Sequence, residues 1–501
     1  MPSLLLLFLT LACLEDNWKR WDYLDAPQLS AVLTLSVTAC WVSLAAFLAH
    51  WTRRELAARP EARDHIAQQY GRKRFYHTFG LYLVYTAALY GLGWGWFVQW
   101  LGVFAFQGDA ATNSSPLGQS LAPPGGTLFP GGELLILAPF LIGLVLSWMF
   151  YYDAERALHG SGPSGEDCYW SRSAYVGFHI RTNLGLVAIP IFLLIAQRTV
   201  SRLLSDFGPP WTAYLGQFFG LGVALALLLC IPWILRLILN LESLPEGPMK
   251  TRLKSLAARL GFRCSDILLW PTRRGLGGGI ANAMVAGVLP RPRYVLLTDR
   301  LVSELTPAEV DAVFGHEVGH IKHHHIPYYA SFLIISFGVL WLCAALLLPD
   351  NELVRQLAAF PFVAVLAAYI FLVFGFLTRR CERQADIYGC RAVSCGRPDC
   401  TGHEDGIVGD SNGKLCPTGI RTFISALEKV VRLNGIDPDK PGFFQSWQHS
   451  TPARRIQFMR GLLTDATLES RFQRRVALVK WGLLLGLGAA LAVLIAVQDW
   501  N

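Results

Sequence analysis

Long apolar stretches, separated by shorter polar segments, set the pattern of this 501-residue chain. A helix needs about 20 predominantly apolar residues to cross a hydrocarbon core of about 30 Å. Stretches of about this length are 29–50, 79–104, 133–152, 175–197, 212–239, 327–349, 355–377 and 476–498. The pattern therefore predicts a mainly α-helical polytopic membrane protein with seven to eight transmembrane helices.

The polar region between the fifth and sixth stretches predicts a small α+β domain. Helix-forming residues fill 250–261, and β-rich runs follow at 266–270 and 294–298. Segment 279–287 lies between the two runs and is predicted to be an edge strand. The glycine-rich run 275–279 that leads into it lacks the lysine and the strand–helix context of a phosphate-binding loop.

These patterns predict five regions along the chain. They are an N-terminal transmembrane region of about five spans (1–245), a first polar region with the α+β domain (246–326), a transmembrane helical pair (327–377), a second polar region (378–474) and a C-terminal transmembrane helix (475–501).

Composition and charge agree with a membrane protein. Apolar residues make up 53% of the chain and charged residues only 16%, which is unlike an ordinary soluble domain. Basic residues crowd the loop 53–74, whereas 107–130 contains none, so the first loop is predicted to be cytoplasmic. Counting spans onward places both polar regions in the cytoplasm, beneath the cell (inner) membrane. The net charge of +8 then indicates positive-inside bias and attraction to anionic lipid, not nucleic-acid binding.

The strongest chemical signal is the pentad His-Glu-Val-Gly-His at 316–320. Histidines four residues apart lie on one face of a helix, so His316 and His320 can bind one Zn²⁺. Glu317 can accept a proton from the water that such a metal activates. Thr306 and Glu309 form a predicted capping box at the start of this helix. A surface helix with coincidental histidines is the alternative interpretation of the pentad alone.

A second segment supplies the third ligand that a catalytic zinc needs. Glu382 and Asp386 are four residues apart, so they share a helical face. We expect Glu382 to bind the metal and Asp386 to accept the outer N–H of a ligand histidine. If Glu382 is not the third ligand, His325 is the next candidate. The alternative for this segment alone is a charged, solvated helical turn beside the membrane.

The pentad, followed by Glu382-x-x-Ala385-Asp386 across two apolar spans, resembles the integral-membrane zinc endopeptidases. This family comprises the type I CAAX prenyl proteases and the HtpX-like heat-shock proteases. The resemblance extends over about 210–460 and implies a zincin-type catalytic domain. His325 matches a histidine typical of the CAAX branch.

The resemblance also implies residues that contact substrate. His449 and Arg455 keep the six-residue interval of the family's His…Arg pair, although Ser450-Thr451 here precede the proline that usually follows this histidine. Both residues would bind the substrate backbone or stabilise the tetrahedral oxyanion. Asn282 would offer its amide to a peptide that adds to the edge strand; an ordinary turn asparagine is the alternative.

Cysteines concentrate after the second acidic segment. Cys390, Cys395, Cys400 and Cys416, with His403 nearby, form a candidate site for a second, structural zinc. Reduced thiols in the cytoplasm argue against disulfides. Unrelated thiols and a redox site remain alternative interpretations, and 391–417 is predicted to be an insertion.

The predicted function is a membrane-embedded zinc endopeptidase with one catalytic zinc ion. Its partners would be a peptide or membrane-protein substrate and the lipid bilayer. The sequence leaves two cellular tasks as alternatives. One is the processing of C-terminal or lipidated substrates, and the other is quality control of membrane proteins. A non-hydrolytic membrane scaffold or transporter that retains a zinc site is the alternative, although a purely structural site has no need of Glu317 as a base.

Overall fold

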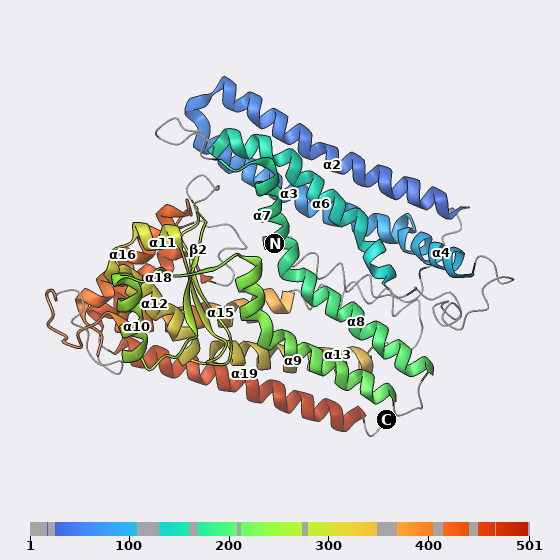
Figure 1. Ribbon diagram of the computed structural model, residues 1–501. Coiled ribbons are helices and arrows are strands. Elements are labelled where there is room, and N and C mark those ends of the chain that lie inside the picture. Colours follow the sequence, from blue (N-terminus) through green and yellow to red (C-terminus); the bar gives the residue numbers. More distant parts are fainter. Residues whose placement is uncertain are drawn as a thin grey trace. The chain divides into compact units, whose positions relative to one another are not determined.

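The computed structural model is mainly helical with one small sheet. It describes residues 18, 26–107, 129, 131–159, 169–207, 212–272, 279–347, 368–403, 414–439, 449–465 and 467–498. The chain forms two compact units (Figure 1), which are Met1–Asn240 with Arg273–Gly279, and Leu241–Thr272 with Ile280–Asn501.

The first unit is entirely helical in its described part. Its helices are α2 (Pro27–Ala58), η1 (Pro60–Ala62), α3 (Arg63–Gly91), α4 (Trp94–Gln107), α6 (Gly132–His159), α7 (Arg172–His179), η3 (Ile180–Gly185), α8 (Leu186–Phe207) and α9 (Thr212–Ile238). Helix α2 packs against α3 and α6, and α8 packs against α9. Fully buried Leu81, Tyr85, Ile136 and Phe140 belong to the core of this unit.

Several predicted spans appear as long apolar helices. Three described helices are long and apolar enough to cross a membrane, namely Pro27–Ala58, Gly132–Leu158 and Leu468–Val497. Two bent pairs raise this number to five if each pair is one span, namely His65–Gly91 with Trp94–Gly102, bent by 57°, and Arg172–Gly185 with Val187–Val200, bent by 46°. Gly93, at a φ of 70°, lies in the first break.

The remaining predicted spans are covered only in part. Stretches 212–239 and 327–349 overlap α9 and α13 (His325–Leu347), whose apolar helical segments in the described residues are Leu229–Ile238 and His325–Leu340. Most of 355–377 lies outside the described residues. The predicted number of seven to eight transmembrane helices therefore stays a prediction.

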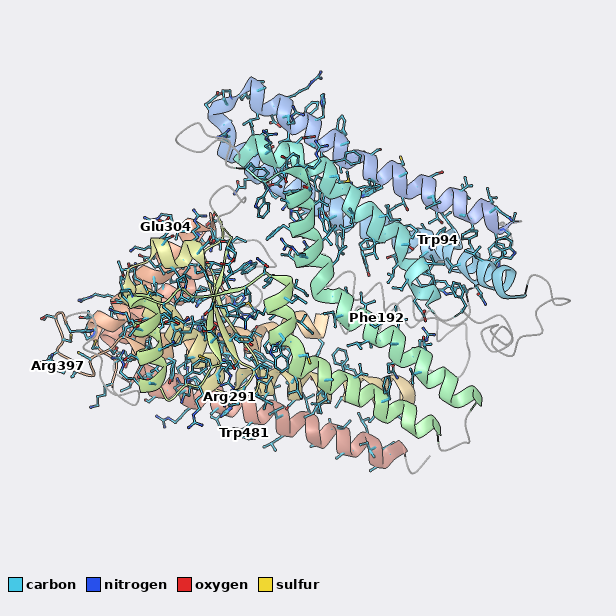
Figure 2. The ribbon with its side chains drawn as sticks, viewed as in Figure 1. Trp94, Phe192, Arg291, Glu304, Arg397 and Trp481 are labelled. Carbon is cyan, nitrogen blue, oxygen red and sulfur yellow. The ribbon has the colours of Figure 1, made fainter. Side chains whose placement is uncertain are left out.

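The second unit combines the sheet with helices. Its strands are β1 (Glu242–Ser243), β2 (Asp266–Trp270), β3 (Ala283–Ala286) and β4 (Tyr294–Thr298). Its helices are α10 (Pro248–Arg259), α11 (Asp299–Glu304), α12 (Pro307–Lys322), α13, η4 (Ile370–Phe374), α15 (Gly375–Ala392), α16 (Pro417–Leu433), α18 (Pro452–Thr464) and α19 (Leu468–Gln498). Exposed Leu478, Trp481 and Leu485 give α19 an apolar outer face (Figure 2) that suits contact with lipid.

The sheet has the order β1-β2-β4-β3, with β2 and β4 parallel and the other two pairings antiparallel. The predicted strands 266–270 and 294–298 are confirmed, and the strand within 279–287 is the four-residue β3. Every residue of β4 is buried, as its continuous apolar run requires. Strand β3 forms one edge of the described sheet and packs beside α12.

Helix α12 begins as predicted. Thr306 and Glu309 form the capping box, in which each side chain accepts a hydrogen bond from the other residue's backbone N–H. The Glu309 carboxylate also accepts hydrogen bonds from Ser425 Oγ (2.6 Å) and Lys429 Nζ (2.7 Å) of α16. The cap therefore fixes α12 against α16 as well as starting the helix.

Glycines let α12 and α15 approach each other closely. A Cβ atom added to Gly315 would lie 2.3 Å from Ala392 Cβ, and one added to Gly319 would lie 2.9 Å from Tyr388 Cβ. On the facing helix, a Cβ added to Gly389 would lie 2.8 Å from the Ala312 carbonyl oxygen. This close crossing brings the helix of the pentad against the helix that carries Glu382.

We expect Gly315→Ala to lower the thermal stability of the protein and its zinc content. The added methyl group overpacks the crossing, which costs about 1–3 kcal/mol, and a gain of roughly 1 kcal/mol in helix propensity offsets only part of this. Gly482→Ala on α19 is the matched control, because nothing lies within 4 Å of its added Cβ. Thermal unfolding in detergent and zinc analysis would measure both variants, and equal stability would contradict the close crossing.

Candidate metal centre

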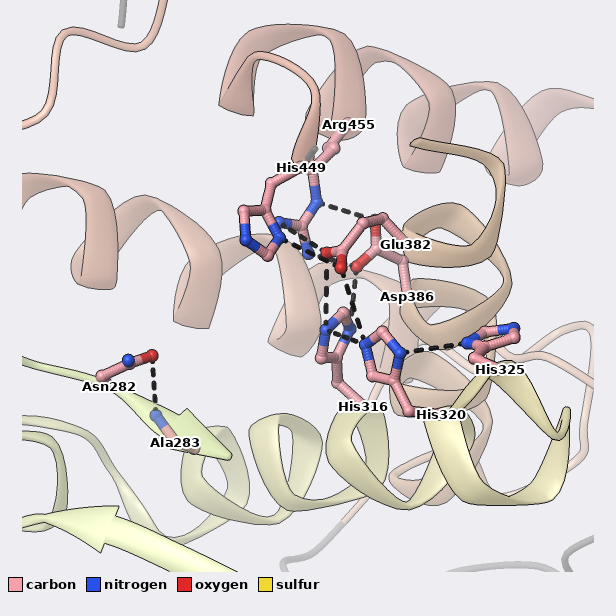
Figure 3. Close-up of polar contacts among 9 residues, drawn as sticks. All are labelled: Asn282, Ala283, His316, His320, His325, Glu382, Asp386, His449 and Arg455. Atoms are coloured by element: carbon pink, nitrogen blue, oxygen red, sulfur yellow. Dashed lines mark hydrogen bonds and ion pairs between the residues drawn. The ribbon is translucent and has the colours of Figure 1, made fainter. Parts of the chain in front are cut away.

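Three ligand atoms converge between α12 and α15 (Figure 3). One atom each from His316, His320 and Glu382 lies within 4.8 Å of the other two. The two histidine Nε2 atoms are 3.3 Å apart. They lie 3.8 Å (His316) and 3.7 Å (His320) from the nearer Glu382 carboxylate oxygens. The predicted ligand set is thus brought together on one face of the helix pair.

Asp386 lies behind the first histidine, as the sequence predicts. Its Oδ1 atom is 3.0 Å from His316 Nδ1, so the Nε2 atom of that ring is left to face the ligand group. The carboxylate is fully buried and is held by the guanidinium of Arg455, with Nε donating over 2.9 Å to Oδ2. Burial raises the pKa of Asp386, but Arg455 and His316 outweigh it and hold this pKa below its usual value.

A chain of polar side chains orients the second histidine. Gln384 Nε2 donates to Gln473 Oε1 (2.6 Å), which leaves Gln384 Oε1 to accept from His325 Nε2 (3.2 Å). The Nδ1 atom of His325 then has a lone pair, and it lies 3.0 Å from His320 Nδ1. His320 therefore carries its proton on Nδ1 and presents the Nε2 lone pair to the ligand group.

The donor set fits Zn²⁺. Two imidazole nitrogens and one carboxylate are the protein ligands of many catalytic zinc sites. Burial lowers the pKa of His320 to about 4, so this ring is neutral near pH 7 and can bind a metal. His325 lies on the outer side of His320, away from the Glu382 carboxylate (Figure 3). Its position suits a residue that orients a ligand.

His449 and Arg455 both reach the acidic ligand. His449 Nδ1 lies 3.0 Å and Arg455 Nη1 3.6 Å from the Glu382 carboxylate. Burial raises the pKa of Glu382, but the hydrogen bond from His449 and the charges of both partners hold it well below its usual range. The side chain of His449 is 58% exposed, whereas that of Arg455 is only 12% exposed.

The glutamate of the pentad lies between the ligand group and the sheet edge. Its carboxylate accepts a hydrogen bond from the backbone of Val285 in β3. Burial raises the pKa of Glu317 to about 7, against a lowering contribution from His316. A divalent cation at the neighbouring ligands would add positive charge and lower this pKa again.

Asn282 lies apart from the ligand group, at the start of β3 (Figure 3). Its Oδ1 atom accepts a hydrogen bond from the Ala283 N–H over 2.9 Å. Its backbone N–H donates to Thr298 Oγ1, and the Thr298 N–H donates to its carbonyl. These bonds fix the asparagine at the end of the sheet edge, where its amide is exposed.

The cysteine segment differs from the prediction in one member. Cys395, Cys400 and Cys416 come together with His403, but Cys390 does not belong to this group. Cys390 lies within α15 and is fully buried, with its Sγ 3.7 Å from Met459 Sδ. The helix runs on to Ala392, so its geometry turns Cys390 into the core and away from the loop that follows.

Sequence reasoning missed three residues of the metal centre. Gln384 and Gln473 are 89 residues apart in the chain, and only the fold brings them together. Phe423 of α16 also stacks on His316, with ring centroids 6.0 Å apart. A glutamine two residues after Glu382 was the one local signal that could have pointed to this network.

Comparison with known proteins finds a family that matches part of the chain. Residues 244–461 match the model of peptidase family M48. The predicted resemblance to membrane zinc endopeptidases is thereby confirmed at the level of the family, and the M48 segment contains every residue of the metal centre described above except Gln473.

Individual relatives come from both predicted branches. The chain is 27% identical over 222 residues to a protease HtpX homolog of Archaeoglobus fulgidus, which covers 43% of this chain and 63% of that protein. It is 28% identical over 199 residues to a CAAX prenyl protease 1 homolog of Dictyostelium discoideum, covering 37% of this chain and 46% of the relative. The matches thus span about half to two thirds of the relatives' length.

A solved structure has a similar fold. The crystal structure of S. mikatae Ste24p aligns with a TM-score of 0.52, covering 85% of this chain and 98% of that one. At 15% sequence identity, this likeness concerns the fold alone. The similarity of fold covers most of the chain.

Proposed function

We propose that this protein is a zinc-dependent endopeptidase of a membrane, with His316, His320 and Glu382 as its metal ligands. The observation that carries the proposal is the convergence of these three side chains beside Glu317. A structural zinc site is normally closed by four protein ligands. Three ligands with a carboxylate alongside are the arrangement of a hydrolytic site.

In this proposal Glu317 is the general base and acid. A Zn²⁺ ion on the three ligands would supply Lewis acidity, which acidifies water and polarises a peptide carbonyl. Glu317 accepts the proton of the attacking water and delivers it to the leaving nitrogen. Its contact with the backbone of Val285 holds the carboxylate between the ligand group and β3.

Strand β3 would bind the substrate. A peptide can pair with an exposed edge strand through main-chain hydrogen bonds that depend little on sequence. Because β3 packs beside α12, a peptide added there would run past Glu317. Asn282 stands at the start of this edge and would contribute its exposed amide to the peptide backbone.

His449 and Arg455 would have different roles, one in contact with the substrate and one in positioning the acidic residues. The exposed ring of His449 is available to a bound peptide, so we assign it to stabilising the developing oxyanion. The Arg455 guanidinium is largely buried and engaged with Asp386, so it acts as a positioning residue for Asp386 and Glu382.

The substrate would be a peptide or membrane protein presented at the cytoplasmic face. The placement rests on the basic loop 53–74 and on the count of spans. Similarity to both an HtpX homolog and a CAAX prenyl protease 1 homolog supports either quality control or C-terminal processing as the cellular task. An integral location is supported by the apolar helices.

Metal removal tests the proposal. We expect the full-length protein in detergent to cleave an unstructured peptide, to lose this activity on treatment with a chelator, and to regain it with Zn²⁺. The His316→Ala/His320→Ala double variant controls for a contaminating protease. Zinc-loaded protein that cleaves neither generic peptides nor membrane-protein substrates would favour the non-hydrolytic scaffold.

A further inference from the structure

A second group of metal-binding atoms lies at the junction of α15 and α16. One atom each from Cys395, Cys400, His403 and Cys416 lies within 4.8 Å of the other three. His403 Nδ1 is 3.2 Å from the Cys400 sulfur and 3.9 Å from the Cys416 sulfur. Cys400 and Cys416 are buried, and the other two side chains are half-buried.

The histidine of this group is oriented as a ligand. Its Nε2 atom lies 3.1 Å from the Val393 carbonyl oxygen, which can only accept a hydrogen bond. His403 therefore carries its proton on Nε2, and the Nδ1 lone pair faces the thiols. A backbone carbonyl on the outer N–H is the usual partner of a metal-bound histidine.

Polar groups of α16 also contact two of the sulfurs. Cys416 caps the N-terminus of α16, and the Gly419 N–H donates to its sulfur over 3.2 Å. Thr418 Oγ1 lies 3.4 Å from the Cys400 sulfur. Helix N-termini and N–H donors stabilise thiolates, which are the form that binds metals.

We propose that Cys395, Cys400, His403 and Cys416 bind one structural Zn²⁺. Three thiolates and one imidazole form a closed tetrahedral set, which suits Zn²⁺ and leaves no position for a substrate. On binding, the thiols release their protons to solvent and the ion takes the sulfur and Nδ1 lone pairs. This site is separate from the metal centre on His316, His320 and Glu382.

The position of this cysteine site explains what it would stabilise. It joins the end of α15, the helix of Glu382, to the start of α16, whose Phe423 stacks on His316. Ser394 reinforces the junction, because its hydroxyl accepts from the Cys416 N–H and donates to the Cys390 carbonyl. Arg397, which lies between Cys395 and Cys400 in the sequence, is exposed at the periphery of the second unit (Figure 2).

Cobalt substitution tests this proposal independently of catalysis. In the His316→Ala/His320→Ala background, the cysteine site is the one group of metal-binding atoms that remains among the described residues. We expect this variant to bind one Co²⁺ per chain with an intense thiolate-to-cobalt charge-transfer absorption, which a site of histidines and a carboxylate cannot produce. The wild type should hold two zinc ions and the double variant one.

Matched cysteine variants locate the ligands. Cys400→Ser in the same background should weaken the charge-transfer band and lower the affinity for Co²⁺, whereas Cys264→Ser, at a half-buried cysteine of the second unit, should leave both unchanged. His403→Ala should lose the metal because it removes a ligand. His403→Cys restores a ligand at the same position, so it should retain the metal and show a stronger band. Retention in His403→Cys would show that the loss in His403→Ala is not caused by misfolding. Cys390→Ala should also keep the band, since Cys390 lies outside the group.

The opposite results would overturn the proposal. A double variant without zinc and without the cobalt band, while its thiols react freely or are joined in a disulfide, would show that the four side chains do not form a metal site. A band whose intensity and affinity are unchanged by Cys400→Ser would also overturn it. Absence of peptide cleavage by the zinc-loaded wild type, with the band of the double variant intact, would instead count against the proposed protease function alone.

Discussion

Glu317→Gln should abolish peptide cleavage while the protein keeps its zinc and its fold. Glutamine has nearly the same shape but cannot accept a proton, and general acid–base assistance is typically worth about 10²–10⁴-fold in rate. The ligands His316, His320 and Glu382 are untouched, so the metal should stay bound. The measurement is the turnover of a fluorogenic peptide by variants of equal zinc content.

The matched control is Glu428→Gln, at an exposed residue of α16 whose salt bridge to Arg460 lies on the surface. Its turnover should equal that of the wild type, because exposed ion pairs contribute little to stability. A Glu317 variant that works within a few-fold of the wild type would remove this residue from the mechanism. The match of 244–461 to the model of peptidase family M48 would stand in that case, since it does not depend on this residue alone.

Features that depend on neighbouring residues could be predicted from the sequence. The capping box of Thr306 and Glu309 and strands 266–270 and 294–298 appear where they were expected, because caps and apolar runs are local signals. The four-residue spacing of the pentad predicted a shared helical face for the same reason. The contacts of Glu309 with α16 could not be predicted, since they join residues far apart in the chain.

The cysteine segment shows where local reasoning failed. Cys390 is near the other cysteines in sequence, but α15 continues past it and buries its side chain beside Met459. His403, which was expected near the site, is instead the fourth member of the group. Cysteines that are close in sequence need not share a site when a helix ends between them, as α15 does between Cys390 and Cys395.

The membrane spans show a similar limit. Hydropathy predicts the length of an apolar stretch but not a break within it, and stretch 79–104 is split by a bend of 57° at Gly93. Likewise, the close crossing of α12 and α15 depends on Gly315 meeting Ala392, 77 positions along the chain. Such pairings follow from the tertiary fold, which a single sequence does not contain.

Glu382→Ala should remove the zinc ion of the metal centre. The substitution leaves only His316 and His320 as ligands and deprives Arg455 and His449 of a carboxylate that both contact. Asp386→Asn should have a milder effect, about a 10–100-fold loss of zinc affinity, because it alters only the partner of a ligand. Competition with a chelator, followed by metal analysis, would measure both variants.

The His316→Ala/His320→Ala double variant sets the baseline for this measurement, because any zinc that it retains is bound elsewhere. Glu382→Ala should fall to the same baseline. If it keeps its full zinc, the third ligand lies elsewhere, with His325 as the next candidate. The geometry opposes that outcome, because His325 Nδ1 faces His320 Nδ1 and its Nε2 is engaged with Gln384. A Glu382→Ala/His325→Ala variant would decide between a new ligand and a water molecule in the vacated position.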